Sequence, residues 1–210
     1  MIVLACSWLL SLPIQAQDST SRSSSEVRGS GHIVRETKLV APFTEIQTQQ
    51  FPAMIAVEVG GQESSLAISL DDNLRPYLRI DQQNGILKLA FAQPSGKPVW
   101  ISQSIIRVTI RTPQLIGFRH GSNSDVLIQG LSGEWFDLAN EANGSVRLRG
   151  KVTRFNVISA ANGDVRADEL LTQTANVVSK ANATLRVNAK VMEAINSGQG
   201  QVINVAKRAE

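Results

Sequence analysis

Three arginines recur in the C-terminal half of the chain at the spacing of a repeated sequence pattern. Arg147, Arg166 and Arg186 each come directly after the apolar residue that closes a short polar segment. If the repeats stack as neighbouring strands, equivalent side chains lie about 4.8 Å apart, so the three guanidinium groups form one outward strip. Such a strip is either a solvated face relieved by acidic neighbours, or a surface that binds an acidic glycan, a lipid headgroup or a cell-surface polymer.

Other residue types that could carry out chemistry do not form a recognisable catalytic set. Asp125 and Asp164 occupy one position in the first and third repeats. Calcium binding or catalysis would use such carboxylates, but turn hydrogen bonding to backbone N–H groups explains them as well. His32 and His120 lie in separate segments with no His or Cys beside them, and a metal site needs several converging ligands. We therefore expect no catalytic residue, no metal and no cofactor.

The repeat that would position these residues is an apolar residue, a small polar corner and a second apolar residue. Its closing apolar residues are spaced 20, 19, 20 and 17 positions apart, at Val126, Val146, Val165, Leu185 and Val202. Asn tolerates the positive φ of a tight turn, which suits it to a corner. Four corners carry Asn at one register position, at Asn123, Asn143, Asn162 and Asn182.

A unit of about 20 residues is too small to bury its own apolar face, so it must stack on its neighbours. We therefore predict an all-β fold: a right-handed parallel β-helix (β-solenoid) with about five C-terminal coils of roughly 19–20 residues, preceded by irregular β-strands up to about Pro113. The corner Asn side chains then form a ladder whose amides hydrogen-bond from coil to coil. In the first half, Asn84-Gly85 predicts a hairpin and residues 71–78 predict one helical turn.

The composition favours one domain and gives no support to a nucleic-acid partner. The chain has 210 residues, of which 42% are hydrophobic and only 5% are aromatic. Small and β-branched side chains suit the narrow interior of a coil better than a helical bundle. The net charge is +3 and the basic residues are spread along the chain, so we expect no nucleic acid to be bound.

Residues 1–17 carry no charge and are mostly apolar, but they are too short to span a bilayer. They predict a secretory signal peptide removed after Ala16, which leaves a mature chain without a transmembrane segment. The sequence Val-Leu-Ala-Cys ending at Cys6 loosely matches a lipid-attachment box, so a lipid anchor is the alternative. Residues 18–28 are almost free of apolar side chains and predict a disordered leader, and residues 29–210 are expected to form a single folded domain.

Several segments, in the same order, resemble one bacterial family. They are GSGHIVRET at residues 29–37, FTEI at 43–46, DDNLRPYL at 71–78 and NGILKL at 84–89, followed by the Asn-Gly-Asp-Val corners. Together they are similar to the putative autotransporter adhesin head GIN domain family, although the corners of that family more typically read Gly-Ser-Gly-Asp. The resemblance implies an exported protein with a parallel β-helix, and the family has no recognised catalytic residues to carry over.

These observations predict an exported, non-catalytic envelope protein in the periplasm or at the cell surface that serves in binding, adhesion or scaffolding. Its expected partner is an acidic glycan or cell-surface polymer, and the coil ends could join copies into an oligomer. A polysaccharide-acting lyase or hydrolase is the alternative from another class, and it would require a cleft with converging acid, base and ion-binding groups. A purely structural assembly partner is the third possibility.

Overall fold

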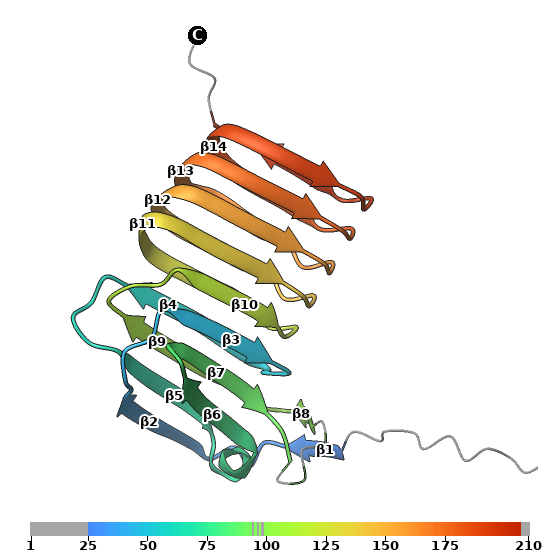
Figure 1. Cartoon of the computed structure of the whole chain (residues 1–210). Coiled ribbons are helices and arrows are strands. Elements are labelled where there is room, and N and C mark those ends of the chain that lie inside the picture. The colour runs from blue at the N-terminus through green and yellow to red at the C-terminus, as the bar shows by residue number, and fades with distance from the viewer. Residues whose placement is uncertain (1–24, 94, 96, 98, 207–210) are drawn as a thin grey trace, which may run out of the picture.

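The computed structural model describes residues 25–93, 95, 97 and 99–206, and in these residues the chain is built from strands, with no α-helix (Figure 1). The expected signal peptide and the first part of the expected leader lie outside them. Ser25–Arg28, at the end of that leader, form strand β1 and pair in parallel with β8 (Val99–Ser102). In the part of the chain that the structure describes, no helix has the length and hydropathy needed to cross a membrane.

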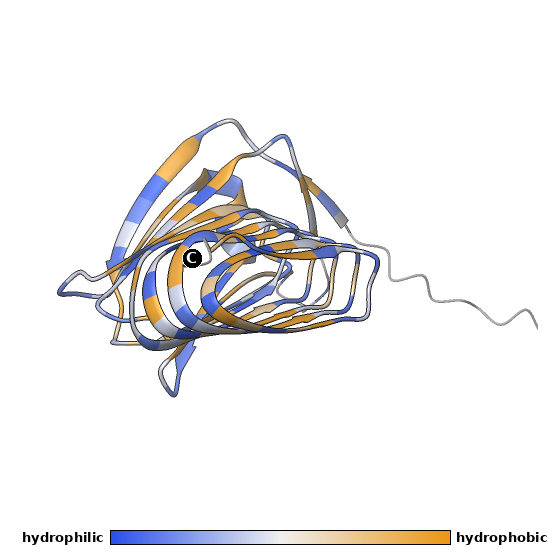
Figure 2. Cartoon of the chain, turned by 90° about the horizontal axis from the view of Figure 1, so that it is seen from above, coloured by the Kyte–Doolittle hydropathy of each residue, from blue (hydrophilic) through white to orange (hydrophobic). Residues whose placement is uncertain are grey.

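The C-terminal half consists of strands that stack in parallel, with equivalent residues of the repeats paired on either side of one register shift in each pair from β11 to β14 (Figure 1). They are β11 (Val126–Asn140), β12 (Val146–Ser159), β13 (Val165–Ser179), β14 (Thr184–Asn196) and β15 (Gln201–Asn204). The first four bend along their length, and the view from above shows the coils superposed around one interior (Figure 2). The predicted alignment of the five closing apolar residues is confirmed, because each pairs with the next, from Val126 to Val202.

The N-terminal half continues the same sheet from the edge of β11 that faces away from β12, as two branches that start at the two ends of this strand. One branch runs through β10 (Gly117–Gly121), β3 (Glu45–Gln49), β7 (Ile86–Phe91) and β6 (Leu78–Gln83). The other runs through β4 (Ala53–Val59), β9 (Ile106–Thr112), β5 (Ser65–Asp71) and β2 (Ile33–Leu39). All of these strands belong to one 13-stranded sheet that also contains the C-terminal strands.

This sheet is mixed: the C-terminal strands pair in parallel, and part of the N-terminal half pairs antiparallel. The pairs β2–β5, β5–β9 and β6–β7 are antiparallel. Asn84 and Gly85 have φ angles of 53° and 75°, which close the two-residue hairpin between β6 and β7 and thereby reverse the chain. The predicted helical turn is present as the 3₁₀ segment η1 (Asp72–Tyr77), which leads directly into β6.

The interior is filled by alternate side chains of each strand, most of them aliphatic. Val146, Val165 and Leu185 occupy one position in successive coils and are fully buried. Phe136 and Phe155 stack in the same interior, with ring centroids 6.3 Å apart and planes 14° apart. Complete burial of a side chain of this size stabilises a fold by about 1.5–3 kcal/mol. The inward side chains, stacked from coil to coil, therefore hold the coils together, and only the outward side chains remain available for a binding site.

The corner asparagines stack as predicted, and each amide oxygen accepts a hydrogen bond from the next coil. The backbone N–H of Asn143 donates to Oδ1 of Asn123 at 3.1 Å, and the N–H of Asn162 donates to Oδ1 of Asn143 at 3.2 Å. The N–H of Asn182 continues the series to Asn162 at 3.3 Å. The predicted coil-to-coil bonding of the amides is therefore confirmed, and the partner of each amide oxygen is a backbone donor of the next corner.

Gly144 provides a test of this close stacking. A Cβ added there would overlap the backbone oxygen of Ser124 and would lie 2.7 Å from the backbone oxygen of Ser122. We expect Gly144→Ala to lower the free energy of unfolding by roughly 3 kcal/mol, because the two coils must separate. Urea unfolding followed by circular dichroism measures this change.

The matched control is Gly61→Ala, where the nearest atom to the new Cβ is an oxygen of Glu63 at 3.9 Å. This variant should stay within about 0.5 kcal/mol of the parent, as most surface substitutions do. Equal unfolding free energies for the two variants would contradict the role assigned to the corner.

Candidate functional site

The structure places the three predicted arginines in one outward column, which we name the arginine strip. Arg147 pairs with Arg166, Arg166 pairs with Arg186, and all three side chains are exposed. Because neighbouring strands are about 4.8 Å apart, the strip concentrates positive charge on one face of the coil. A groove of about 500 Å³ runs beside it. Acidic residues also line this groove, namely Asp164, Asp168 and Glu169.

The acidic neighbours neutralise the arginine strip only in part. A guanidinium nitrogen of Arg166 lies 4.0 Å from Oδ2 of Asp164. Glu169 instead pairs at 3.0 Å with Arg149, which lies outside the strip. Among residues 25–93, 95, 97 and 99–206, Arg147 and Arg186 have no carboxylate within ion-pair distance. Two of the three charges are therefore available to an external anion.

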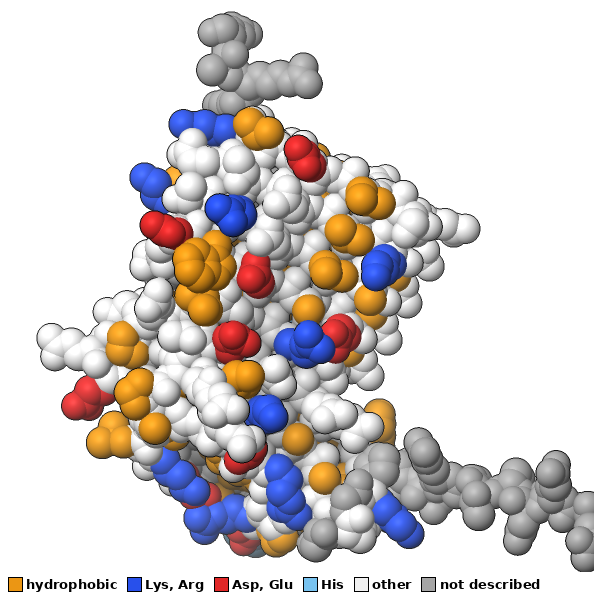
Figure 3. All heavy atoms as spheres, viewed as in Figure 1, with side chains coloured by type: hydrophobic (Ala, Val, Ile, Leu, Met, Phe, Trp, Pro, Cys, Tyr) orange, Lys and Arg blue, Asp and Glu red, His pale blue; other side chains and the backbone are white. Residues whose placement is uncertain are grey.

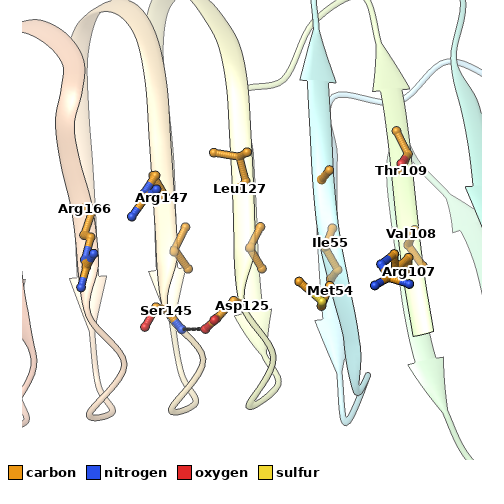
Figure 4. A pocket seen from close by; sticks show the side chains of 13 residues that line it. Met54, Ile55, Arg107, Val108, Thr109, Asp125, Leu127, Ser145, Arg147 and Arg166 are labelled. Atoms are coloured by element: carbon orange, nitrogen blue, oxygen red, sulfur yellow. Dashed lines mark hydrogen bonds between the residues drawn. The ribbon is translucent and has the colours of Figure 1, made fainter. Parts of the chain in front are cut away.

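A second hollow adjoins the strip, and the sequence analysis missed it. This hollow, which we name the apolar groove, has a volume of about 480 Å³. Met54 and Ala56 of β4 and Leu127 of β11 form its floor, between Arg107 of β9 and Arg147 of β12 (Figure 4). Met54 is 57% exposed, and together with Ala56 and Leu127 it places apolar surface in contact with solvent. The only signal in the sequence is the run of apolar residues around Met54, which does not reveal which strands lie beside it.

The two carboxylates considered for catalysis or calcium binding are engaged at the corners. Oδ1 of Asp125 accepts the backbone N–H of Ser145 at 3.0 Å, and this bond borders the apolar groove (Figure 4). Oδ1 of Asp164 accepts the backbone N–H of Thr184 at 2.9 Å. This is the turn-bonding alternative that we weighed for both residues. Within the described residues, no cluster of three or more His, Cys, Asp or Glu side chains is placed to hold a metal ion.

His120 is fully buried and hydrogen-bonds to the backbone of a corner from the interior. Its Nδ1 lies 2.9 Å from Oγ1 of Thr48, and its Nε2 lies 2.7 Å from the backbone oxygen of Ser124. The backbone oxygen of Ser124 can only accept a hydrogen bond, so the neutral ring must carry its proton on Nε2. Nδ1 is then unprotonated and accepts a hydrogen bond from the hydroxyl group of Thr48. Desolvation lowers the pKa of His120 below its ordinary value of 6.5, although the bond to Ser124 and the charge of Asp125 act in the opposite direction.

The same inward position carries a polar residue in each following coil. His120 pairs with Asn140, Asn140 with Ser159, and all three are fully buried. Asn140 donates from Nδ2 to the backbone oxygen of Gly144 at 3.3 Å, just as His120 donates to the residue four positions later. His120 is therefore one member of a structural column and is not directed at a ligand.

A further polar column lies on the face opposite the arginine strip, and the sequence analysis did not identify it. Asn156 donates from Nδ2 to Oδ1 of Asp137 at 2.6 Å, and Asn176 donates to Oδ1 of Asn156 at 2.8 Å. Exposed apolar side chains run beside it, including Ile158 at 47% exposure (Figure 3). The 19- and 20-residue spacing of these three polar residues equals that of the corners, so extending the repeat beyond the corners could have found them.

The family model described as "Putative auto-transporter adhesin, head GIN domain" matches residues 42–206. The chain belongs to this family. The resemblance found in the sequence is thereby confirmed. No protein of curated function matches the chain.

Solved structures with a similar chain path are distant in sequence. A putative adhesin from Bacteroides fragilis is 15% identical, with a TM-score of 0.64, and the match covers 85% of this chain and 100% of that chain. A putative lipid binding protein from Parabacteroides distasonis is 13% identical, with a TM-score of 0.49, over 86% of this chain and 100% of that chain. The first of these shows a shared fold and carries no information about a ligand.

Protonation of His120 should destabilise the head GIN domain. Because its pKa is lowered on folding, the unfolded chain binds the proton more readily, so this residue costs stability only below pH 6.5. We expect the free energy of unfolding to fall by at most about 1.4 kcal/mol per pH unit as the pH drops from 6.5 towards the lowered pKa. Urea unfolding as a function of pH measures this slope.

The matched variant is His120→Asn, which places in this coil the residue that the next coil carries at Asn140. It retains a side-chain donor for Ser124 but cannot titrate. Its unfolding free energy should be less dependent on pH than that of the parent between pH 6.5 and the lowered pKa, and identical profiles would argue against His120 as the source.

Proposed function

We propose that this head GIN domain is an exported, non-catalytic binding module of the cell envelope, and that it recognises an acidic glycan or another acidic surface polymer along the arginine strip. The proposal takes the stacked coils as a right-handed parallel β-helix that acts as a rigid support. Membership of a family named for adhesins is consistent with binding at a surface. The observation that carries the proposal is the register of Arg147, Arg166 and Arg186 on one exposed column.

A polymer is the ligand class that best fits a column of this kind. Guanidinium groups about 4.8 Å apart repel one another unless anions lie between them. One chain with repeated carboxylate or phosphate groups supplies several anions for a single loss of translational freedom. Arg147 and Arg186, at the two ends of the strip, lack an ion-pair partner within the described part of the chain, which leaves their donors free for such a ligand.

The export part of the proposal rests on the apolar residues 1–17, which predict a signal peptide. Removal of this segment would deliver the domain to the periplasm or the cell surface, and lipid attachment at Cys6 would tether it to a membrane. Protein recovered from the native host with an intact Met1 would contradict cleavage.

Replacing the arginine strip tests the binding proposal. We expect the triple variant Arg147→Ala, Arg166→Ala and Arg186→Ala to bind polygalacturonate, an acidic glycan, at least about tenfold more weakly, because three charge-assisted contacts are lost. Binding by the parent should also weaken as salt is added. Isothermal titration calorimetry measures both effects.

The matched control removes three exposed basic side chains outside the strip, with Lys88→Ala, Arg154→Ala and Lys180→Ala. It has the same change in net charge, so it should retain the affinity of the parent. An equal loss of affinity for polygalacturonate in both variants would show that net charge alone causes the effect, and it would overturn the role of the strip. Shortening of the polymer on incubation would instead support the lyase or hydrolase alternative.

A second candidate function, assembly through the coil end, is favoured by the edge of β14. Strand β15 pairs only with Thr184–Val187, so in the described chain residues 191–196 have no strand on their outer side. Ala194 is exposed there, although Val177 directly beneath it is 1% exposed. An open edge with apolar residues is a template for another strand. A second copy of the chain is the occupant we propose, because identical edges can pair about a two-fold axis.

Sedimentation velocity tests this assembly. The parent should form dimers as its concentration rises, and Met192→Lys, which places a charge at the end of the core, should remain monomeric. A control substitution on the exposed face, Lys190→Met, should still dimerise. A parent that stays monomeric at all concentrations would exclude assembly through this edge.

A further inference from the structure

The apolar groove combines features that a site for acidic polymers does not need. Its floor consists of Met54, Ala56 and Leu127, and the methyl-bearing Thr109 borders it. A chain of hydroxylated sugars would lose hydrogen bonds to water over such a floor without replacing them. An exposed apolar floor instead favours a ligand that has carbon to bury.

Cationic side chains stand on two sides of this floor. Arg107 lies on β9, and Arg147 and Arg166 lie on β12 and β13, with β4 and β11 between them (Figure 4). Asp125 is the one carboxylate among the described residues that line the groove, and one of its oxygens accepts the N–H of Ser145. Arg166 is partly compensated by Asp164, but Arg107 and Arg147 have no carboxylate within ion-pair distance among the described residues, so the groove carries positive charge around an apolar centre.

We propose that the apolar groove binds a single anionic amphiphile, an acyl chain that carries a carboxylate or phosphate group. The acyl chain lies on Met54, Ala56 and Leu127, and the anionic group is held by Arg147, with Arg107 or Arg166 as the second donor. The volume of about 480 Å³ is within the range of roughly 300–1,000 Å³ typical of small-molecule sites. The argument for this site does not depend on the polymer proposal, although Arg147 and Arg166 line both sites.

Dodecyl phosphate, used as a monomer below its micelle concentration, is the probe for this site. Calorimetry with the parent should give saturable binding to one site. Each methylene removed from the chain should weaken binding by up to about fourfold, the effect expected for loss of one buried CH₂ group. Inorganic phosphate should bind far more weakly, because it has no carbon to bury.

Variants separate the floor from the charges. Leu127→Ser should weaken dodecyl phosphate binding at least about tenfold, while Ile158→Ser, which alters a more exposed apolar residue on another face, should have no effect. Met54→Ser is the second floor variant, at a more exposed position where folding is less at risk. Arg147→Ala should weaken binding as well, whereas Arg186→Ala should not, because Arg186 lies in the arginine strip but outside the groove.

These outcomes also distinguish this site from the polymer site. Leu127→Ser should leave polygalacturonate binding unchanged, and Arg186→Ala should weaken polygalacturonate binding alone. The amphiphile site is overturned if the parent does not bind dodecyl phosphate, if both floor variants bind it as the parent does, or if inorganic phosphate binds equally well. Binding to phosphatidylglycerol vesicles without binding to the monomer would assign the groove to a membrane surface and would also overturn it.

Discussion

The close stacking of small corners is the constraint on which the rest of the structure depends. From the inside, Nδ2 of Asn140 donates to the backbone oxygens of Gly144 and Gly163, at 3.3 and 3.0 Å. From the outside, Oδ1 of Asn143 accepts the N–H of Asn162 at 3.2 Å. A side chain at either glycine would push the coils apart, because Cβ atoms there would overlap the backbone of the preceding coil. The corners thus fix both the spacing of the coils and their register.

Register in turn decides what the exterior presents. Side chains alternate between the two faces of a strand, so a slip of one residue between coils would exchange inward and outward positions. The inward column from Val146 to Leu185 would then face water, and the arginines that follow these residues would enter the core. The arginine strip therefore exists only because the corners hold successive coils in step. A binding surface of this kind is a property of the stack and not of any one coil.

The sequence predicted the repeating part of the fold well because the information there is local and periodic. Matching letters from Val126 to Val202 became paired residues, and the arginines that follow them became a column. The pairing of β4 with β9 and β11 has no such signal, since it joins segments of unrelated sequence. The apolar groove lies on that junction, and for this reason it could not be located from the sequence.

The sequence predicted which asparagines stack at the corners, but it could not predict which atom of the next corner each side chain bonds to. An Asn side chain can bond either to the next side chain or to the next backbone, and the choice depends on which donors the turn leaves unpaired. At the corners the N–H of Asn143 is free, and Asn123 accepts it. Asp137 and Asn156 instead lie within paired strands, where the backbone groups already bond to one another, so Asn156 bonds to the side chain of Asp137.

The arginine strip and the apolar groove meet at Arg147 and Arg166, which line both. If the strip holds a polymer and the groove holds an amphiphile, each ligand uses the charge that the other requires. The two binding equilibria are then coupled, and each ligand must lower the affinity for the other by the same factor. The in-register strands leave the strip and the groove no means of moving apart, because their separation is set by the spacing of the stack. The same surface would thus bind either an anionic polymer or an anionic amphiphile, and the two ligands would compete for Arg147 and Arg166.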